Sequence, residues 1–262
     1  MAAIAPDPPE PQRKVIVVMP AYNAAKTLEK TVLDLPLDDI STVILVDDAS
    51  HDDTIQIAKT LGLTVFTHTR NFGYGANQKT CYTEALRTDA TLIVMVHPDY
   101  QYDPTMLPQL IRPIEEGAAD VVFGSRMMGV SAFHQGMPWW KYVANKTLTN
   151  LENRVFGLWL SEFHTGYRAY DRKVLEQVNF RANSDGFIFD QEIVAQMVEC
   201  GLRITEVSVP VRYFPEASSA NLLTSIVYGL GILWLLIRFL LHRAGLLRST
   251  QFVSYGSRYR SA

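Results

Sequence analysis

A short polar run that directly follows an apolar one is the part of this sequence best suited to chemistry. Residues 91–96 are mostly β-branched or apolar and uncharged, which is typical of a strand buried on both faces of a sheet. Polar groups follow from His97 to Gln101. Asp99 and Gln101 are two residues apart, so in an extended chain their side chains point the same way. Two such oxygen donors suit Mg²⁺ or Mn²⁺ carrying a diphosphate.

The same segment also has a purely structural interpretation. Asp103 and Pro104 can begin the next helix, because proline is favoured in a first turn, and the polar run then only ends a strand. The position favours a ligand site, since open α/β sheets bind ligands at the carboxyl ends of their strands. The rest of the sequence has to decide between the two.

The elements that would position this run follow an alternating pattern. Strands are predicted over residues 14–19, 42–46, 63–67, 91–96 and 121–124. Apolar residues at helical spacing lie between them, and Asn23 can cap the first such helix. Beyond residue 126 the alternation is less regular, with helices predicted over 138–156 and 190–200 and strands over 165–170, 204–209 and 211–214. The pattern predicts an α/β fold whose mostly parallel sheet carries helices on both faces.

Polar residues follow four of the predicted strands, and parallel strands bring these ends to one edge of the sheet. They are Pro20, Ala21, Tyr22 and Asn23, then Asp47 and Asp48, then residues 97–101, and finally Ser125 and Arg126. Acids gathered there repel one another unless a cationic or donor-rich ligand lies between them. Asp48 can accept hydrogen bonds from a nucleoside, Tyr22 can stack on a base, and Arg126 can pair with a phosphate. Asp47 is more simply a turn residue.

Local motifs and composition exclude several classes of protein. The Gly-rich turn of a dinucleotide-binding fold is replaced by Pro-Ala-Tyr-Asn, and no Walker-type phosphate loop occurs. Cys81 and Cys200 show no metal-ligand spacing and are expected to be reduced residues of a cytosolic protein. The net charge of −3 combines an acidic body with five arginines after Glu216, which favours an anionic membrane surface over nucleic acid. Residues 1–13 contain four prolines and are expected to be a disordered leader without a secretory signal.

Five stretches in one order resemble a known family. They are VIVVMPAYNAAKTLEKTV, VILVDDAS, VHPDYQYDP, FGSR and HTGYRAY, within residues 14–214. Together they resemble family 2 glycosyltransferases of the GT-A fold, and within that group the dolichyl- and polyprenyl-phosphate sugar transferases. The resemblance implies a GDP- or UDP-sugar donor, Mg²⁺ or Mn²⁺, inversion at the anomeric carbon and a lipid-phosphate acceptor. It places the enzyme in the cytoplasm, at the cytosolic face of a membrane, with a catalytic body over residues 14–216.

The resemblance also assigns expected roles to individual residues. Nucleotide-sugar binding falls on Pro20, Ala21, Tyr22, Asn23, Asp48, His97, Pro98, Asp99 and Arg126. Metal binding falls on His97, Asp99 and Gln101, catalysis on Asp99, Arg126 and Arg168, and the acceptor side on Lys141, Arg168, Asp190 and Glu192. A phosphate acceptor is already ionised and needs no base, whereas a hydroxyl acceptor would need Asp190, Glu192 or Glu162 as its base. Arg168 can equally be a buried ion-pair partner, Asp190 a helix N-cap, and His164 a loop hydrogen-bonder.

Two departures from the family pattern leave other functions open. His97 stands where the family usually has an aspartate, which removes a negative charge and suits Mn²⁺ better than Mg²⁺. A basic clamp after the last strand is replaced by residues 215–219, where Glu216 would repel a lipid phosphate. The alternatives are transfer to a hydroxyl acceptor, or a catalytically silent partner or scaffold subunit that binds nucleotide-sugar.

The C-terminal segment, residues 217–262, is predicted to hold an apolar helix. Residues 217–237 carry no charge, and a helix over 222–241 would be about 30 Å long, enough to span a bilayer. With a cytosolic body, one crossing would place the five arginines outside, against the positive-inside tendency. A helix in the membrane interface with Arg238, Arg243 and Arg248 at the headgroups therefore fits better. The alternative is packing against the body or a second subunit, with Gly229 and Gly231 at the contact.

Overall fold

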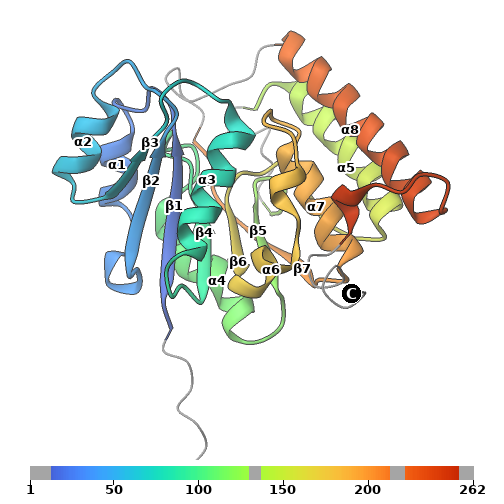
Figure 1. The fold of residues 1–262 in the computed structure, drawn as a ribbon, viewed down its shortest axis with the longest axis horizontal. Helices are drawn as coiled ribbons and strands as arrows, with labels where there is room; N and C mark the ends of the chain where they lie inside the picture. Colours follow the sequence, from blue (N-terminus) through green and yellow to red (C-terminus); the bar gives the residue numbers. More distant parts are fainter. Residues whose placement is uncertain (1–12, 130–136, 213–221, 254–262) are drawn as a thin grey trace, which may run out of the picture.

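One mixed sheet runs through the molecule (Figure 1). The structure is a computed structural model that describes residues 13–129, 137–212 and 222–253. The strands are β1 (Val15–Ala21), β2 (Thr42–Asp47), β3 (Thr64–Thr67), β4 (Leu92–Met95), β5 (Val121–Ser125), β6 (Arg168–Asp171) and β7 (Ile204–Ser208). Their order across the sheet is β3-β2-β1-β4-β6-β5-β7.

The predicted α/β fold with a mostly parallel sheet is confirmed. β6 is the exception, because it pairs antiparallel with both β4 and β5. β1 runs past its predicted end, since Pro20 and Ala21 keep their register with β2 and the Ala21 carbonyl accepts from the Asp48 amide. Of the strand predicted over 211–214, the structure has only an isolated bridge from Val211 to Tyr102. Residues 213 and 214 lie outside the described part of the chain.

Helices cover both faces of the sheet. They are α1 (Leu28–Leu33), α2 (Thr54–Thr60), α3 (Tyr74–Leu86), α4 (Leu107–Glu115), α5 (Trp139–Phe156), α6 (Arg172–Gln177), α7 (Phe189–Glu199) and α8 (Leu222–Arg243). Side chains of β1 alternate between two buried clusters. Val15 and Val17 join the one that includes α1, α2 and α4, while Ile16 and Val18 join the one that includes α3, α6, α7 and α8. A strand buried on both faces has to be apolar throughout, as β1 is.

Two expected helix caps form differently. Asn23 adopts a left-handed backbone conformation with φ of 52°, and its side chain accepts from the His51 amide, while α1 begins only at Leu28. Asp190 is not the N-cap of its helix, because α7 begins one residue earlier. Its carboxylate instead accepts hydrogen bonds from α3, as described below. Asn23 thus stabilises a turn and Asp190 contacts a neighbouring helix, and neither side chain caps the helix for which it was predicted.

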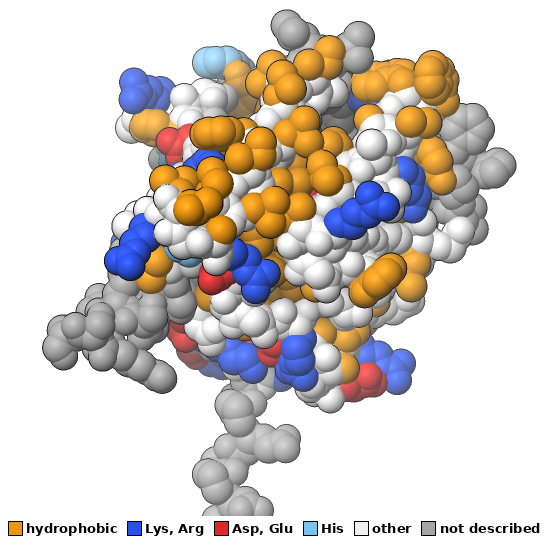
Figure 2. Space-filling model, turned by 90° about the vertical axis from the view of Figure 1, so that its right-hand side faces the viewer, with side chains coloured by type: hydrophobic (Ala, Val, Ile, Leu, Met, Phe, Trp, Pro, Cys, Tyr) orange, Lys and Arg blue, Asp and Glu red, His pale blue; other side chains and the backbone are white. Residues whose placement is uncertain are grey.

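The apolar C-terminal helix α8 packs beside α5 along one edge of the molecule (Figure 1). Its buried side chains are Ile232, Leu235, Leu236 and Phe239, which lie on one face at helical spacing. The segment Thr224–Arg243 is long and apolar enough to cross a membrane by length and composition alone, with a mean hydropathy of 1.9. In the structure, 22% of its most apolar 18-residue stretch is buried against the rest of the protein. Figure 2 views this side of the molecule and shows hydrophobic side chains gathered in a band across it.

Candidate active site

Two adjoining cavities lie where the strands end. The first cavity, of about 410 Å³, is lined by Pro20, Ala21, Tyr22, Asn23, Ala24, Thr27, Asp48, Asn71, Gly73, Tyr74, Asn77, His97, Pro98, Asp99 and Phe187. The second cavity, of about 240 Å³, is lined by Tyr74, His97, Asp99, Gln101, Tyr102, His164, Thr165, Gly166, Phe187, Asp190, Thr224, Ser225 and Tyr228. The two share four side chains, including His97 and Asp99. A ligand that fills both would therefore pass over His97 and Asp99.

The first cavity gathers eight of the nine residues predicted to bind a nucleotide-sugar, all except Arg126. The other residues of the lining were not predicted from the sequence, namely Ala24, Thr27, Asn71, Gly73, Tyr74, Asn77 and Phe187. A signal for part of this set was present in Gly73 and Gly75. A Cβ on Gly73 would lie 2.7 Å from the Asp185 carbonyl oxygen, and one on Gly75 would lie 2.5 Å from that of Ser184. The two glycines therefore let the start of α3 approach the loop that carries Phe187.

Asp48 is buried and holds one wall of the first cavity together. Its carboxylate accepts from the backbone amides of Phe72 and Gly73 at 2.9 Å each. One of its oxygens also lies 2.6 Å from His68 Nδ1. These contacts fix the loop that follows β3. Asp47, interpreted from the sequence as a turn residue, accepts from the Ser50 amide.

The segment from His97 to Gln101 is a turn and not the extended chain that the sequence reasoning assumed. Tyr100 has φ of 58°, and Asp99 Oδ1 accepts from the Gln101 amide at 3.1 Å. The side chains of Asp99 and Gln101 nevertheless both line the second cavity. Burial raises the pKa of the Asp99 carboxyl, against the opposing effects of His97 and the Gln101 amide.

The His97 ring is held between a tyrosine and a glycine. It stacks on Tyr74 with ring centroids 5.6 Å apart, and its Nε2 lies 3.3 Å from the Tyr74 hydroxyl. On the other side, a Cβ on Gly166 would come within 2.4 Å of the ring. Gly166 is therefore required for the imidazole to occupy this place.

The donor set fits a metal that arrives with its ligand better than a site built by protein alone. Among the residues that the structure describes, no three His, Cys, Asp or Glu side chains are grouped to hold a metal ion. His97 and Asp99 line both cavities and Gln101 lines one. Mg²⁺ is commonly held by one or two carboxylates, with the remaining ligands from phosphates and water. These three side chains fit such a metal–diphosphate site.

Arg126 lies behind the second cavity, paired with a buried glutamate. Its backbone amide and guanidinium donate to Glu162, and Nη2 also donates to the His164 carbonyl at 2.6 Å. Burial acts to raise the pKa of Glu162, but Arg126 outweighs it and holds that pKa below its usual range. The guanidinium carbon lies 5.8 Å from the centre of the Tyr102 ring, which lines the second cavity. Glu162 is thus occupied by Arg126 and is poorly placed to act as a base.

The predicted acceptor-side residues separate into different environments. Asp190 lines the second cavity and accepts from the Tyr74 hydroxyl at 2.6 Å. Arg168 lines neither cavity, and its buried guanidinium donates to backbone carbonyls and lies 3.7 Å from Asp190 Oδ1. Glu192 accepts from the Ser184 amide and also lines neither cavity. Lys141 lines neither cavity, and burial together with the positive charge of Arg126 lowers its pKa.

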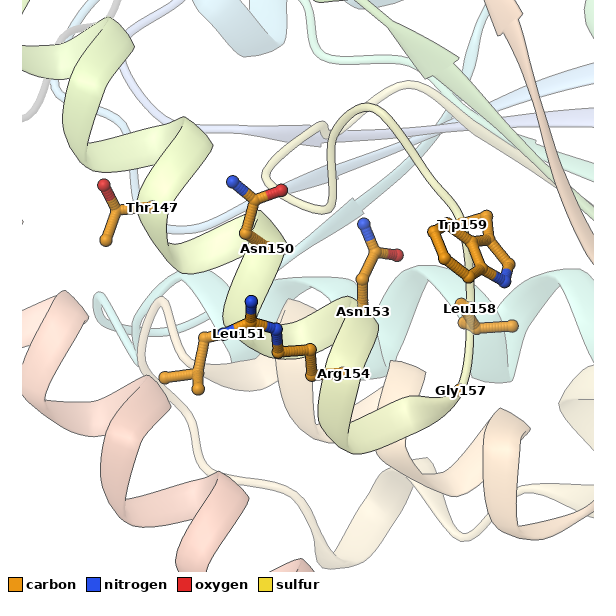
Figure 3. A pocket seen from close by; sticks show the side chains of 8 residues that line it. All are labelled: Thr147, Asn150, Leu151, Asn153, Arg154, Gly157, Leu158 and Trp159. Atoms are coloured by element: carbon orange, nitrogen blue, oxygen red, sulfur yellow. The ribbon is translucent and has the colours of Figure 1, made fainter.

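A larger cavity of about 830 Å³ lies away from these residues, at the end of α5 (Figure 3). Its lining consists of Thr147, Asn150, Leu151, Asn153, Arg154, Gly157, Leu158 and Trp159. Trp159 is 95% exposed, and Asn153 hydrogen-bonds the Leu160 backbone through both ends of its amide. None of the residues predicted to act in catalysis lines this cavity.

The chain belongs to glycosyl transferase family 2, whose family model matches residues 16–178. It is a glycosyltransferase, and the resemblance inferred from its motifs is confirmed. The matched region ends before α7 and α8. Those two helices complete the wall of the second cavity.

Two relatives are named for lipid-phosphate acceptors. The chain is 27% identical over 208 residues to the polyprenol monophosphomannose synthase of Mycolicibacterium smegmatis, covering 76% of this chain and 77% of the relative. It is 24% identical over 240 residues to the UDP-N-acetylglucosamine–dolichyl-phosphate N-acetylglucosaminyltransferase of Methanococcus voltae, covering 85% and 94%.

A solved structure shares the fold. Glucosyl-3-phosphoglycerate synthase from Mycobacterium tuberculosis, in complex with Mn²⁺, uridine diphosphate and phosphoglyceric acid, superposes with a TM-score of 0.68. The identity is 19%, and the match covers 91% of this chain and 81% of that one. The likeness establishes the GT-A-like architecture.

Proposed function

We propose that this enzyme transfers a sugar, with inversion, from a GDP- or UDP-sugar to a polyprenyl or dolichyl phosphate, with Mg²⁺ or Mn²⁺ as cofactor. The observation that carries the proposal is that three hollows follow one another and share lining residues. The two cavities share His97 and Asp99, and the second meets an apolar groove at Ser225. This α5–α8 groove, of about 380 Å³, is lined by Trp140, Ala144, Thr147, Leu148, Ser225, Ile226, Gly229, Leu230 and Leu233. Such a path suits a polar donor, a phosphate head and a hydrocarbon chain in that order.

The residues can promote this reaction without a general base. A phosphate oxygen of the acceptor bonds to the anomeric carbon as the bond to the donor diphosphate breaks, so nucleoside diphosphate leaves. The bound cation would neutralise negative charge on that diphosphate. Asp99, His97 and Gln101 would hold the cation. Tyr22 would pack on the nucleobase of the donor, and Arg126 would add positive potential. Positioning and electrostatics therefore account for the rate, and the names of the two lipid-phosphate relatives support the acceptor.

A transfer assay with matched acceptors tests the proposal. GDP- and UDP-sugars are incubated with Mn²⁺ and either polyprenyl phosphate or the corresponding polyprenol. We expect product only with the phosphate and none after EDTA is added. The alcohol needs a base, and the candidate carboxylates are already engaged, Asp190 by Tyr74 and Gln78 and Glu162 by Arg126. Transfer to the alcohol, or donor binding without any turnover, would contradict the proposed acceptor and favour the hydroxyl-acceptor or scaffold function respectively.

We further propose that the face formed by α5 and α8 lies in an anionic membrane surface. One side of α8 is already packed on the body, and the opposite side exposes Val227, Leu230 and Trp234 by about 60% each. Lys and Arg side chains lie around the hydrophobic band of this face (Figure 2). A helix that keeps its inner face on the body and inserts its outer face fits an interfacial position better than a span. Arg238 and Arg243 also contact Gln251 and Glu199, so Arg248 is the more available headgroup contact.

Replacing Val227, Leu230 and Trp234 together by serine should weaken binding to anionic phospholipid vesicles by roughly 30-fold or more, because their apolar area no longer leaves water. Flotation with vesicles containing phosphatidylglycerol measures the effect. Leu33→Ser serves as the control, since Leu33 is equally exposed but lies on α1. Unchanged flotation of the triple variant would exclude this face as the membrane contact.

A further inference from the structure

A buried carboxylate beside the second cavity has no explanation in the proposed reaction. Glu152 of α5 is fully buried, and neither of its carboxylate oxygens has a hydrogen-bond partner among the described residues. His164 Nε2 lies 3.2 Å from Glu152 Oε2, within ion-pair distance but not aligned as a hydrogen bond. Burying an uncompensated carboxylate is costly, and such groups in folded proteins call for a functional or structural reason. His164 is the counter-ion that this arrangement offers.

The other ring nitrogen of His164 faces α8. Nδ1 lies 3.2 Å from the Tyr228 hydroxyl and 3.2 Å from Gln191 Nε2. Gln191 Nε2 also donates to the Tyr228 oxygen at 2.8 Å. His164 and Tyr228 both line the second cavity, so a chain of contacts runs from the buried Glu152 through the imidazole to a hydroxyl at the cavity wall. Three separate elements supply its members, which are α5, the loop before β6, and α8.

The charge of the second cavity makes this chain of contacts relevant to the acceptor. Asp99 and Asp190 line the cavity, and no lysine or arginine is among its described lining residues. His97 and His164 are the side chains of the lining that can carry positive charge. His97 is shared with the first cavity and is a candidate metal ligand, so His164 is the lining side chain that remains to supply positive charge on the acceptor side, in front of the Arg126–Glu162 pair. A phosphate head placed between two carboxylates needs such a group.

We propose that His164 and Tyr228 form the subsite for the phosphate head of the acceptor, with Glu152 as the buried counter-charge of a protonated His164. In this state Nδ1–H and the Gln191 amide both donate to the Tyr228 oxygen, and Nδ1 no longer accepts from Gln191 Nε2. The tyrosine O–H is then available to donate to a phosphate oxygen in the cavity. Burial, together with Asp190 and Glu152, raises the pKa of Tyr228, so the hydroxyl keeps the proton that it donates. The inference rests on the proposed lipid-phosphate acceptor and assigns to α8 a part in building the active site.

Phosphate binding, measured without turnover, tests the subsite. Farnesyl phosphate and inorganic phosphate are titrated by calorimetry into the full chain and into the variants His164→Gln and Tyr228→Phe. Tyr228→Phe removes the hydrogen bond to the phosphate, and His164→Gln removes the positive charge behind that hydroxyl. Each change should weaken the binding of both ligands by roughly 10- to 100-fold. Donor binding, followed by the thermal shift with UDP- or GDP-sugar and Mn²⁺, should stay unchanged, which a general structural defect would not allow. His242→Gln on α8, which lines neither cavity, is the matched control.

Glu152 is a positioning residue, so it needs a test of coupling. In a double-mutant cycle, Glu152→Gln and His164→Gln should each weaken farnesyl phosphate binding, and the double variant should lose little more than either alone. Additive losses would overturn the counter-charge role. If Glu152→Gln does not fold, the His164 and Tyr228 variants decide the subsite by themselves.

The remaining outcomes separate this inference from the proposed function. Unchanged affinities in both variants would overturn the subsite, as would a loss confined to farnesyl phosphate, because the effect would then lie with the lipid tail. No phosphate binding by the unaltered chain would also overturn it. Binding that follows the expected pattern, without any sugar transfer, would retain the subsite and reject the proposed reaction.

Discussion

Asp99→Asn is expected to lower the rate of Mn²⁺-dependent sugar transfer roughly 100- to 1,000-fold, the scale seen when one electrostatic group of an active site is removed. Asp99 is the carboxylate that lines both cavities, so it lies where the leaving diphosphate and its cation would be held. Asparagine keeps the shape of the side chain and removes its charge. The measurement is the initial transfer rate at saturating donor. Asp38→Asn is the control, because Asp38 is exposed, precedes β2 and lines neither cavity.

The stability of the same variant distinguishes loss of function from loss of fold. Burial raises the pKa of Asp99 in the folded protein. The folded state therefore binds the proton of the Asp99 carboxyl more tightly than the unfolded chain does. As pH rises from the ordinary range of an aspartate through the raised pKa, Asp99 loses that proton and the ionised carboxylate lowers the stability of the fold. An asparagine at this position has no such proton, and the melting temperature at pH 7 should be equal to or higher than that of the unaltered chain. Normal activity in the variant would mean that the metal assignment is wrong.

Local sequence signals were sufficient to predict most residues that line the first cavity, which is proposed to bind the donor. Tyr22, Asp48 and Asp99 each follow a predicted strand, and parallel pairing of β1 with β2 and β4 brings those ends together. The prediction needs only the period of the strands and the rule that ligands bind at their carboxyl ends. The alternating pattern likewise predicted the layers of the fold, because each buried strand has to be apolar.

The second cavity, proposed to hold the acceptor, depends on long-range packing that no spacing reveals. Glu152, His164 and Tyr228 come from three elements, and only the docking of α8 on the body brings them together. The left-handed Tyr100 and the antiparallel direction of β6 were also not visible, since neither changes the periodicity of apolar residues. A usable signal was a charged residue such as Glu152 within the predicted helix over residues 138–156, because a charged side chain that such a helix buries requires a partner from elsewhere.

Arg126→Met is expected to destabilise the protein by about 3–5 kcal/mol, which is the usual effect of leaving a buried charge without its partner. Glu162 is fully buried, and among the described side chains Asn145 would remain to donate a hydrogen bond to it. Unfolding by urea at pH 7 measures the loss. Glu162→Gln should be milder, since the arginine left behind keeps a small exposed fraction and its bond to the His164 carbonyl.

The pH dependence of stability should change sign between these proteins. In the unaltered chain Arg126 holds the pKa of Glu162 below its usual range, so the pair stabilises the fold at neutral pH and that contribution is lost as pH falls through this lowered pKa. In Arg126→Met, burial is unopposed and raises that pKa, and stability is lost as pH rises through it. Urea unfolding repeated from about pH 3 to about pH 8 covers the ordinary range of a glutamate and both sides of it, so it distinguishes the two directions. The same slope in both proteins would contradict the assigned cause.

The double variant Arg126→Met with Glu162→Gln then separates the two roles that Arg126 can have. Replacing both members of a buried ion pair is often nearly neutral for stability, so this protein should recover most of the free energy of unfolding that the single variant loses. If Arg126 supplies positive potential to the diphosphate or the acceptor phosphate, the double variant should transfer sugar more slowly than the unaltered chain, although its stability is restored. Recovery of stability together with normal transfer would show instead that Arg126 serves only to neutralise Glu162, and that His97, Asp99 and their cation meet the electrostatic needs of the reaction without it.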